Sequence, residues 1–213
     1  EASGKGNIES KSDVGDYDYT GGLHDVRYIR DPTPIMLSLP KHEAEYTRFN
    51  KISYLRDSIS AREERRLYLT YGPDDQRVRT VYMINNDTIK TKYFALGNYE
   101  KEIDQEGNIR ELYYISSPSG LTAILQKSGS QDSIFYVHTD YLGSYDVITT
   151  ATGTIRQRYN FDPWGRRRNP MDWSYNTGST ALLFDRGFKG HEHLDQFGLI
   201  NMIGRVYDPL LAM

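Results

Sequence analysis

Apolar and polar residues alternate along most of the chain from about residue 45 onward, and short polar turns interrupt the alternation. In a β-strand successive side chains point to opposite faces, so this period of two predicts strands rather than helices. Short runs of this kind, bounded by turn residues, are typical of antiparallel sheets. We expect strands at residues 43–49, 51–57, 66–72, 76–84, 88–96, 98–104, 108–116, 121–127, 133–140, 144–150, 154–162 and 204–210.

One segment competes with this interpretation. The run "SISAREERRL", residues 58–67, is the best helix candidate, but it is short and the strands on both sides favour a hairpin. Residues 21–44 carry "RDPTPIMLSLP", whose three prolines predict extended backbone, and residues 1–20 are rich in Gly, Ser, Lys and Asp. We therefore expect an extended or flexible connector over residues 1–44 and almost entirely antiparallel β-structure after it.

The expected turns repeat one pattern, with Asp in the first position and Gly in the fourth, as in "DQEG" and "DPWG". The carboxylate accepts hydrogen bonds from the turn backbone, proline presets φ, and glycine takes the positive φ that closes a bulged hairpin. The segment "TATG" has the same outline, and "YGPDDQR", residues 71–77, is a looser copy with Asp in place of Gly. A turn that recurs between tyrosine-rich strands indicates a repeat architecture. The structural turn residues are Asp104, Gly107, Gly153, Asp162, Pro163 and Gly165.

Composition narrows the possible functions. The chain has 213 residues, 18 of them Tyr against 7 Phe, which suits sheets that pack a ring on one side and keep its hydroxyl hydrated. Its formal net charge is -3, so it has no long-range attraction for a polyanion. It contains no cysteine, which excludes disulfides and a thiol nucleophile, and no run of about 18 apolar residues that would span a bilayer.

The repeated unit resembles a known family. The residues Tyr159, Phe161, Asp162, Gly165 and Arg166 are similar to the YD repeat, Y-x-[YF]-D-x-x-G-R, of RHS (rearrangement hot spot) proteins. Residues 138–149, "HTDYLGSYDVIT", and residues 184–211 resemble two successive blocks of the RHS-associated core. The core residues that carry this resemblance are Asp140, Leu142, Gly143, Ser144, Gly190, Glu192, Gly198, Leu199, Tyr207, Asp208 and Pro209.

The resemblance departs from the family pattern at Tyr141, at Gln196 with Phe197, and at Ile200, all interpreted as side-chain changes that leave the fold intact. It implies an all-β fold, a curved antiparallel ribbon of hairpins, with YD-type repeats over 45–137 and a truncated core over 138–213. Such a ribbon belongs to a hollow shell of a secreted or cell-envelope bacterial protein. Its expected partners are neighbouring repeats and a C-terminal cargo or toxin polypeptide of the same molecule.

The arginines of "RQRYNFDPWGRRR", residues 156–168, admit two interpretations. Alternation places Arg156 and Arg158 on one face, and predicts that Arg166 and Arg168 lie opposite the Tyr and Phe strand while Arg167 points away. Packing of guanidinium groups on aromatic rings and carboxylates is the favoured function of the cluster. Nucleic-acid binding is the alternative, and the slight acidity of the chain disfavours it.

Histidine and tryptophan offer further candidates. His191 and His193 have the spacing of a metal site on a strand, with His138 near them in the family layout, but structural hydrogen bonding is the preferred role. We expect no metal and no cofactor. Trp164 and Trp173 bracket a loop and would suit stacking on a sugar, so the alternative function is a cell-surface adhesion or carbohydrate-binding module.

Arg205 is the remaining catalytic candidate. In some RHS proteins the core cleaves itself with an Arg from an R-x-Y-D-P block and an Asp from a later D-P-x-G-L block. The run that begins at Arg205 matches the first block, whereas the second is expected beyond Met213. An acid needs neighbours that tune its pKa and a positioned substrate. We therefore expect no enzyme in this chain as it stands, with an aspartyl-type autoprotease core as a further alternative.

Overall fold

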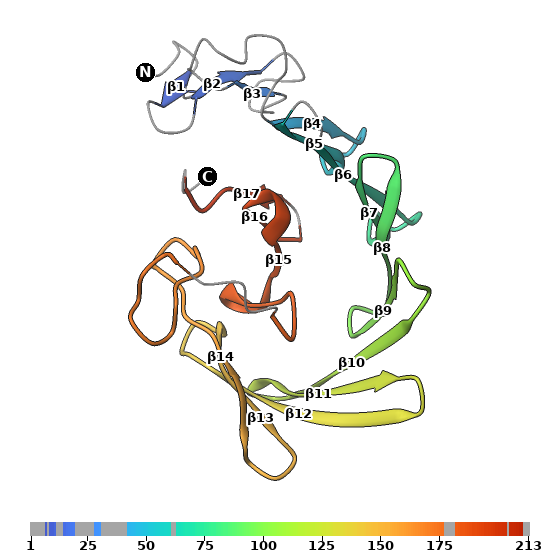
Figure 1. Cartoon of the computed structure of the whole chain (residues 1–213), viewed down its shortest axis with the longest axis vertical. Coiled ribbons are helices and arrows are strands. Elements are labelled where there is room, and N and C mark those ends of the chain that lie inside the picture. The colour runs from blue at the N-terminus through green and yellow to red at the C-terminus, as the bar shows by residue number, and fades with distance from the viewer. Residues whose placement is uncertain are drawn as a thin grey trace. The chain divides into compact units, whose positions relative to one another are not determined.

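The computed structural model describes residues 7, 9–11, 15–19, 28–30, 42–60, 63–176, 182–203 and 205–210. Within these residues the regular structure is β-strand with two short 3-10 turns, η2 (Phe188–Gly190) and η3 (Asp195–Phe197) (Figure 1). The all-β prediction is confirmed. The strands are β1 (Ser10–Lys11), β2 (Gly15–Asp18), β3 (Tyr28–Arg30), β4 (His42–Tyr46), β5 (Ile52–Ser60), β6 (Glu63–Tyr71), β7 (Arg77–Ile84), β8 (Asp87–Ala95), β9 (Tyr99–Asp104), β10 (Ile109–Ser117), β11 (Gly120–Ser128), β12 (Gln131–Thr139), β13 (Tyr145–Thr150), β14 (Ile155–Arg158), β15 (Glu192–Leu194), β16 (Leu199–Asn201) and β17 (Val206–Tyr207).

The main sheet has the simplest possible order, with β1 to β14 side by side in the order of the sequence. A second antiparallel sheet contains β15, β16 and β17. The hairpin prediction for residues 58–67 is confirmed, because β5 and β6 pair antiparallel there. Most of residues 1–44, the expected connector, lies outside the described residues; the described parts include β1, β2 and β3.

The chain forms two compact units. Unit 1 comprises residues 1–93 and 103–107, and unit 2 comprises residues 94–102 and 108–213. The expected boundary between repeats and core, at residues 137 and 138, stays a prediction.

Unit 1 places different chemistry on the two faces of its strands. Leu55 of β5 lies opposite Leu67 of β6, and both side chains are buried. On the other face Arg56 lies opposite Glu43 of β4 and Arg66 of β6. Arg56 forms ion pairs with Glu43, at 3.3 Å, and with Glu64, which also contacts Arg66. We call this cross-strand set, Glu43, Arg56, Glu64 and Arg66, the ion ladder.

Unit 2 contains an aromatic core. Its centre is formed by side chains from β10 to β13, by Tyr159 and by Phe184, which lies in a loop after β14. Phe184 packs edge-on against Phe135 of β12, with ring centroids 5.6 Å apart. The buried members are Leu112, Tyr114, Ile124, Phe135, Val137, Tyr145, Ile148, Tyr159 and Phe184. Burial of such rings and aliphatic side chains stabilises the unit through the hydrophobic effect.

Candidate functional site

The turn at Asp162 is built around one carboxylate. Asp162 Oδ1 accepts hydrogen bonds from the backbone N–H groups of Trp164 and Arg166, both at 2.9 Å. The Gly165 N–H donates to the Asp162 carbonyl at 3.0 Å, and Gly165 has φ +95°. Glycine is required here for two reasons. Its positive φ is strained for other residues, and a Cβ would approach Cδ1 of Phe188 to 2.7 Å. The exposed Pro163 occupies the second turn position.

A second turn of the same construction opens the core block. Asp140 Oδ1 accepts from the N–H groups of Leu142, at 2.9 Å, and Ser144, at 2.8 Å. Gly143 has φ +81° and donates to the Asp140 carbonyl at 3.0 Å. Ser144 is buried and its Oγ accepts from the Lys189 N–H at 3.2 Å, whereas Leu142 is 57% exposed. This turn therefore connects the main sheet to the segment around η2.

Other turns share the backbone hydrogen bond of these two turns. The N–H of the fourth residue donates to the carbonyl of the first in Asp104 to Gly107 and in Thr150 to Gly153. The same bond recurs in Gly187 to Gly190, in Asp195 to Gly198, which leads directly into Leu199 of β16, in Gly72 to Asp75 and in Thr47 to Asn50. Each fourth residue has positive φ, which Asp75 and Asn50 adopt as the non-glycine members. The turn at Thr47 was missed from the sequence because it contains neither the Asp nor the Gly of the pattern.

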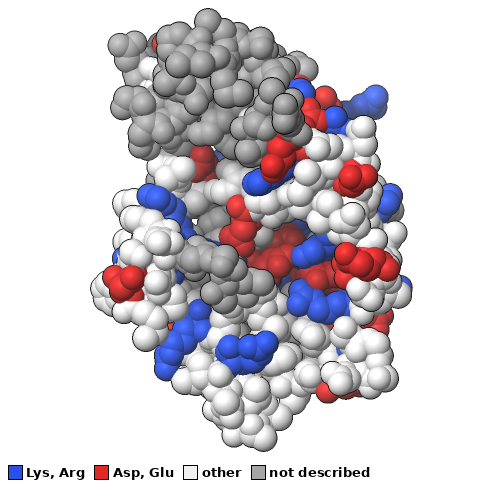
Figure 2. All heavy atoms as spheres, in the orientation of Figure 1, with Lys and Arg blue, Asp and Glu red and all other residues white. Residues whose placement is uncertain are grey.

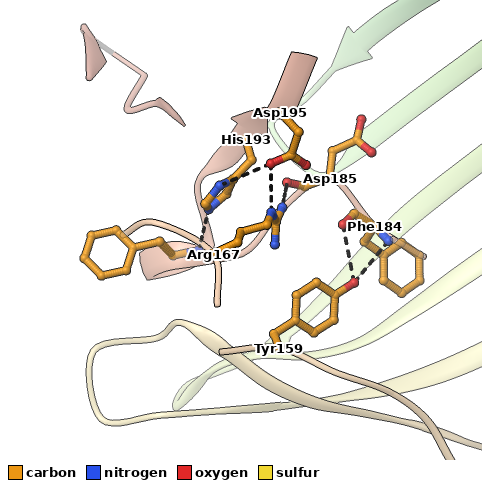
Figure 3. A network of polar contacts seen from close by, with 7 residues as sticks. Tyr159, Arg167, Phe184, Asp185, His193 and Asp195 are labelled. Carbon is orange, nitrogen blue, oxygen red and sulfur yellow. Dashed lines mark hydrogen bonds and ion pairs between the residues drawn. The ribbon is translucent and has the colours of Figure 1, made fainter. Parts of the chain in front are cut away.

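Tyr159 joins the aromatic core to a distant loop. Its hydroxyl donates to the Phe184 carbonyl at 3.3 Å and accepts from the Phe184 N–H at 3.2 Å (Figure 3). Its ring meets Tyr145 edge-on, with centroids 5.9 Å apart. Burial raises the pKa of Tyr159 to about 12. The family-signature tyrosine thus holds backbone that is 25 residues away in the sequence.

The predicted faces of the arginine cluster are wrong. Phe161 and Arg167 form the β-bridge after the turn, so their side chains share a side. The Arg167 guanidinium lies 5.4 Å from the centroid of the Phe161 ring and 5.6 Å from that of Tyr159. Its Nε donates to Asp195 at 2.8 Å and its Nη2 to the Asp185 carbonyl at 3.0 Å (Figure 3). The bulged turn places the second residue after Gly165, rather than the first and third, on the aromatic face.

The flanking arginines also contact aromatic rings. Arg166 lies 3.8 Å from the ring centroid of Tyr175, whose hydroxyl donates to Asp162 Oδ2 at 3.1 Å. Arg168 lies 5.2 Å from the Trp173 ring, and its Nε donates to the Asn160 side-chain oxygen at 2.9 Å. Arg166 and Arg168 therefore hold the loop that contains Trp173 and Tyr175 against the hairpin. Packing on rings and carbonyls accounts for the contacts of this part of the cluster.

His193 has a structural hydrogen bond. It is buried, and its Nε2 accepts from the Phe188 N–H at 3.0 Å (Figure 3). Burial, together with the nearby Arg167, lowers its pKa well below the usual range, so the imidazole is neutral. Burial and the cations Arg186 and Lys189 also lower the pKa of His191. No group of three or more His, Cys, Asp or Glu side chains within the described part of the chain is arranged to hold a metal ion.

An ion pair that sequence reasoning missed lies beside the core. Arg186 donates to Glu100 Oε1 through Nε, at 3.0 Å, and Nη2, at 2.6 Å. The Glu100 side chain is 2% exposed and that of Arg186 26%. Burial opposes the charge on Arg186, but Glu100 raises the pKa of the guanidinium above its usual range. The partners are 86 residues apart, and Glu100 stands in a run of alternating charges that predicts a solvated strand, so nothing local identifies the pair.

Aromatic rings lie close to this pair. The Arg186 guanidinium lies 4.5 Å from the ring centroid of Tyr114, and a cavity of about 230 Å³ is lined by Arg186 and Tyr145 among others. Glu192, a core-signature residue, is buried in β15 and forms a β-bridge with Arg186.

In the Arg205 block, Arg205 itself is exposed, whereas residues 206–208 are partly buried. Arg205 lies on the surface, and its carbonyl accepts from the Met202 N–H at 2.8 Å. Asp208 Oδ1 accepts from the Leu210 N–H at 2.8 Å, burial raises the pKa of Tyr207, and Pro209 is buried. The described part of this block forms the end of the small sheet. Among the described residues, no helix is long and apolar enough to cross a membrane.

Comparisons with known proteins find likeness in fold and none in sequence. No protein-family model matches the chain, and no curated protein matches it. The crystal structure of TcdB2-TccC3-TEV is similar to 81% of the chain, with a TM-score of 0.63 and 14% identity. That of TcdB2-TccC3 is similar to 87% of the chain, with a TM-score of 0.61 and 12% identity. The Tc holotoxin pore of Photorhabdus luminescens is similar to 85%, with a TM-score of 0.58 and 14% identity.

The extent of this likeness limits what it means. The chain spans about 9% of the length of each of these structures. At 12 to 14% identity the likeness is one of fold. The chain therefore has the all-β fold of a segment of Tc toxin components.

Proposed function

We propose that this chain is a non-catalytic wall segment of an RHS-type β-shell, which encloses a cargo or toxin polypeptide of the same molecule. The shell belongs to a secreted or envelope-associated toxin component. The observation that carries the proposal is the strand order of the main sheet, in which every strand from β1 to β14 follows the sequence. Such an order extends a wall by simple addition of hairpins, without crossover connections.

Three further features support this role. The Asp140 and Asp162 turns stand where the resemblance to RHS proteins places signature residues. The similar solved structures are Tc toxin components, and the chain matches a small part of each. Finally, two buried polar side chains of unit 2, Tyr159 and His193, form structural hydrogen bonds with backbone groups.

The proposal is tested by protection of cargo from protease. In the longest natural protein that contains this chain, we expect any polypeptide downstream of the core to resist limited proteolysis. Gly187→Leu opens the wall, because a Cβ at Gly187 already approaches the Phe161 ring to 2.5 Å. We expect the downstream polypeptide to become sensitive in this variant. The matched control is Gly129→Leu, at a turn where a Cβ meets nothing within 4 Å.

If the downstream polypeptide is digested at the same rate in the wild type and in Gly187→Leu, the chain does not enclose it. Circular dichroism of both variants establishes that the two substitutions leave the rest of the strands folded.

The non-catalytic part of the proposal is tested at Arg205. In the same long protein, Arg205→Ala is expected to leave any processing of the chain unchanged, since Arg205 is exposed and Asp208 already accepts a backbone hydrogen bond. Loss of a cleavage product on gel electrophoresis would instead identify an autoprotease core.

A carbohydrate-binding module is the rival function. Trp164 is 56% exposed and Trp173 64%, which leaves part of each ring open to a sugar. Sugar-dependent quenching of Trp fluorescence that disappears in Trp173→Ala would favour this rival over the wall segment.

A further inference from the structure

Two pairs of tyrosines lie across neighbouring strands with the same spacing. The ring centroids of Tyr99, at the start of β9, and Tyr113 of β10 are 5.0 Å apart. Tyr54 of β5 and Tyr68 of β6 are directly opposed in register, and their centroids are also 5.0 Å apart. None of the four residues is buried, and each pair lies within one unit. At this separation the edges of paired rings are in contact.

The two pairs differ in what accepts the phenolic proton. The Tyr99 hydroxyl donates to Glu111 Oε1 at 2.6 Å, the length of a charge-assisted hydrogen bond. Partial burial, together with Glu111, raises the pKa of Tyr99 to about 12, so the phenol keeps its proton at neutral pH. Among the described residues, no carboxylate accepts a hydrogen bond from the hydroxyl of Tyr54 or Tyr68. The pairs therefore have similar geometry and different chemistry.

This difference affects one-electron oxidation. A phenol that loses an electron becomes a strong acid, so oxidation is easiest where a positioned base takes the proton in the same step. Glu111 is such a base for Tyr99. The Lys127 Nζ lies 5.8 Å from the centroid of the Tyr113 ring and opposes positive charge on that ring. Tyr99 is therefore the first of the two to be oxidised.

We propose that Tyr99 and Tyr113 form an oxidative cross-linking site, at which a haem peroxidase with hydrogen peroxide joins β9 to β10 through a dityrosine. Each tyrosine gives one electron to the oxidant and loses its phenolic proton, Tyr99 to Glu111 and Tyr113 to water. The two radicals form a carbon–carbon bond between the ring carbons next to the hydroxyl-bearing carbons. Each of these carbons then loses its hydrogen as a proton, and each phenol oxygen regains one. The two electrons and two protons that leave reduce one hydrogen peroxide to two waters.

The composition of the chain suits such a link. It has 18 tyrosines and no cysteine, so its strands cannot be joined by disulfides. A dityrosine would restrict the unfolded chain between β9 and β10 as a disulfide does. Figure 2 shows Lys and Arg side chains next to Asp and Glu side chains on the face that it presents, and the formal net charge is only -3. Long-range charge therefore does not exclude a second protein that carries the oxidant.

The test uses the longest natural protein that contains this chain, treated with a haem peroxidase and limiting hydrogen peroxide. After digestion with trypsin, mass spectrometry should find the peptides 93–101 and 111–127 joined, with the loss of two hydrogen atoms. Fragmentation should place the link at Tyr99 and Tyr113, and the product should have the fluorescence of dityrosine. Tyr99→Phe and Tyr113→Phe keep the ring but should each abolish this product.

The pair in unit 1 is an internal reference within the same molecule. Its link would join the tryptic peptides 52–56 and 67–77. Because its hydroxyls lack a carboxylate acceptor, this product should form at least about tenfold more slowly than the Tyr99–Tyr113 product. The rate of the reference product should be the same in the wild type and in both phenylalanine variants.

The role of the base is tested by Glu111→Gln, which can still accept the Tyr99 hydrogen bond but holds a proton poorly. We expect the Tyr99–Tyr113 product to form about tenfold more slowly, below the usual range for a positioned base because water can replace it in part. The control is Glu106→Gln, an equal change of charge at an exposed turn residue, which should leave the rate unchanged.

Four results would overturn the inference. They are no link between 93–101 and 111–127, equal rates for the two pairs, equal rates in Glu111→Gln and Glu106→Gln, and a link that joins two molecules. The last is detected by mixing nitrogen-15-labelled with unlabelled protein, because a link within one chain never joins a labelled to an unlabelled peptide. The inference is independent of whether the chain belongs to a shell.

Discussion

The ion ladder of unit 1 and the Arg186–Glu100 pair of unit 2 use the same charges for different purposes. The ladder joins neighbouring strands, and its side chains remain 17 to 28% exposed. The Arg186–Glu100 pair joins residues 86 positions apart, and its carboxylate is 2% exposed. The first arrangement links adjacent strands of one sheet, whereas the second joins the segment that contains Arg186 to β9. Exposure therefore decides how much each contributes to stability.

The largest effect is expected when the buried pair is broken. Arg186→Met leaves the Glu100 carboxylate buried without its cation, and we expect unit 2 to lose about 3 kcal/mol, the low end for such a deletion. Glu100→Gln should cost less, because Arg186 is 26% exposed and its charge can turn towards water. The measurement is hydrogen–deuterium exchange of peptides covering β10 to β13. An equal cost for both variants would show that burial of the carboxylate is not the cause.

The double variant Arg186→Met with Glu100→Gln serves as the control. It removes both charges and should be more stable than Arg186→Met alone, since no ion is left buried. If the double variant is the least stable of the three, the pair is net stabilising rather than a constraint on the position of the loop.

Two turn glycines, Gly165 and Gly153, allow packed and unpacked turns to be compared. Gly165→Ala combines a positive φ of +95° with contacts of 2.7 Å to Phe188 and 2.9 Å to Ile200. We expect a loss of about 2 to 3 kcal/mol, from backbone strain and overpacking together. Gly153→Ala has φ +81° and meets nothing within 4 Å, so about 1 kcal/mol is expected. Denaturant unfolding of both variants makes the comparison; equal losses would exclude packing as a factor.

Local sequence patterns predicted the strands and hairpins, but they did not predict the long-range contacts of unit 2. Alternation and turn residues predicted the strands on both sides of residues 58–67, because each hairpin depends on residues close in sequence. The predicted face of Arg167 was wrong, because the bulge at the turn reverses the faces of the side chains that follow Gly165. Contacts such as Tyr159 with Phe184, or Arg186 with Glu100, join segments whose spacing carries no periodic signal. Long-range closure is a tertiary property, so sequence patterns of 10 to 20 residues do not contain it.

Low pH is expected to destabilise unit 2, because the described histidines with a lowered pKa, His191 and His193, both belong to this unit. An unfolded histidine takes up a proton near pH 6.5, while His193 in the fold stays neutral. Its contribution is therefore complete above pH 6.5 and is lost as the pH falls towards the lowered folded pKa, by up to about 1.4 kcal/mol per pH unit. The titratable and charged groups around it are Arg167, Asp185, His191 and Asp195, whose Oδ1 lies 3.8 Å from His193 Nδ1.

The test is exchange of peptides from residues 184–201 between about pH 7.5 and pH 5, corrected for intrinsic rates. Protection should fall more steeply with acid in the wild type than in His193→Gln, which retains an acceptor for the Phe188 N–H and cannot titrate. Parallel pH profiles in the two proteins would assign the acid sensitivity to other groups.

The smallest effect is expected in the ion ladder, where the geometry also predicts an order. Arg56 and Arg66 are cross-strand partners, and Glu64 contacts both. Arg66→Gln removes one partly exposed contact and should cost about 0.5 kcal/mol. Glu64→Gln leaves two arginines facing each other, so its cost should be higher, about 1 kcal/mol. Urea unfolding at low and high salt measures this, and salt should reduce the Glu64→Gln effect because it screens the exposed repulsion. A salt-independent cost would mean that the ladder is held by packing of the arginine stems rather than by charge.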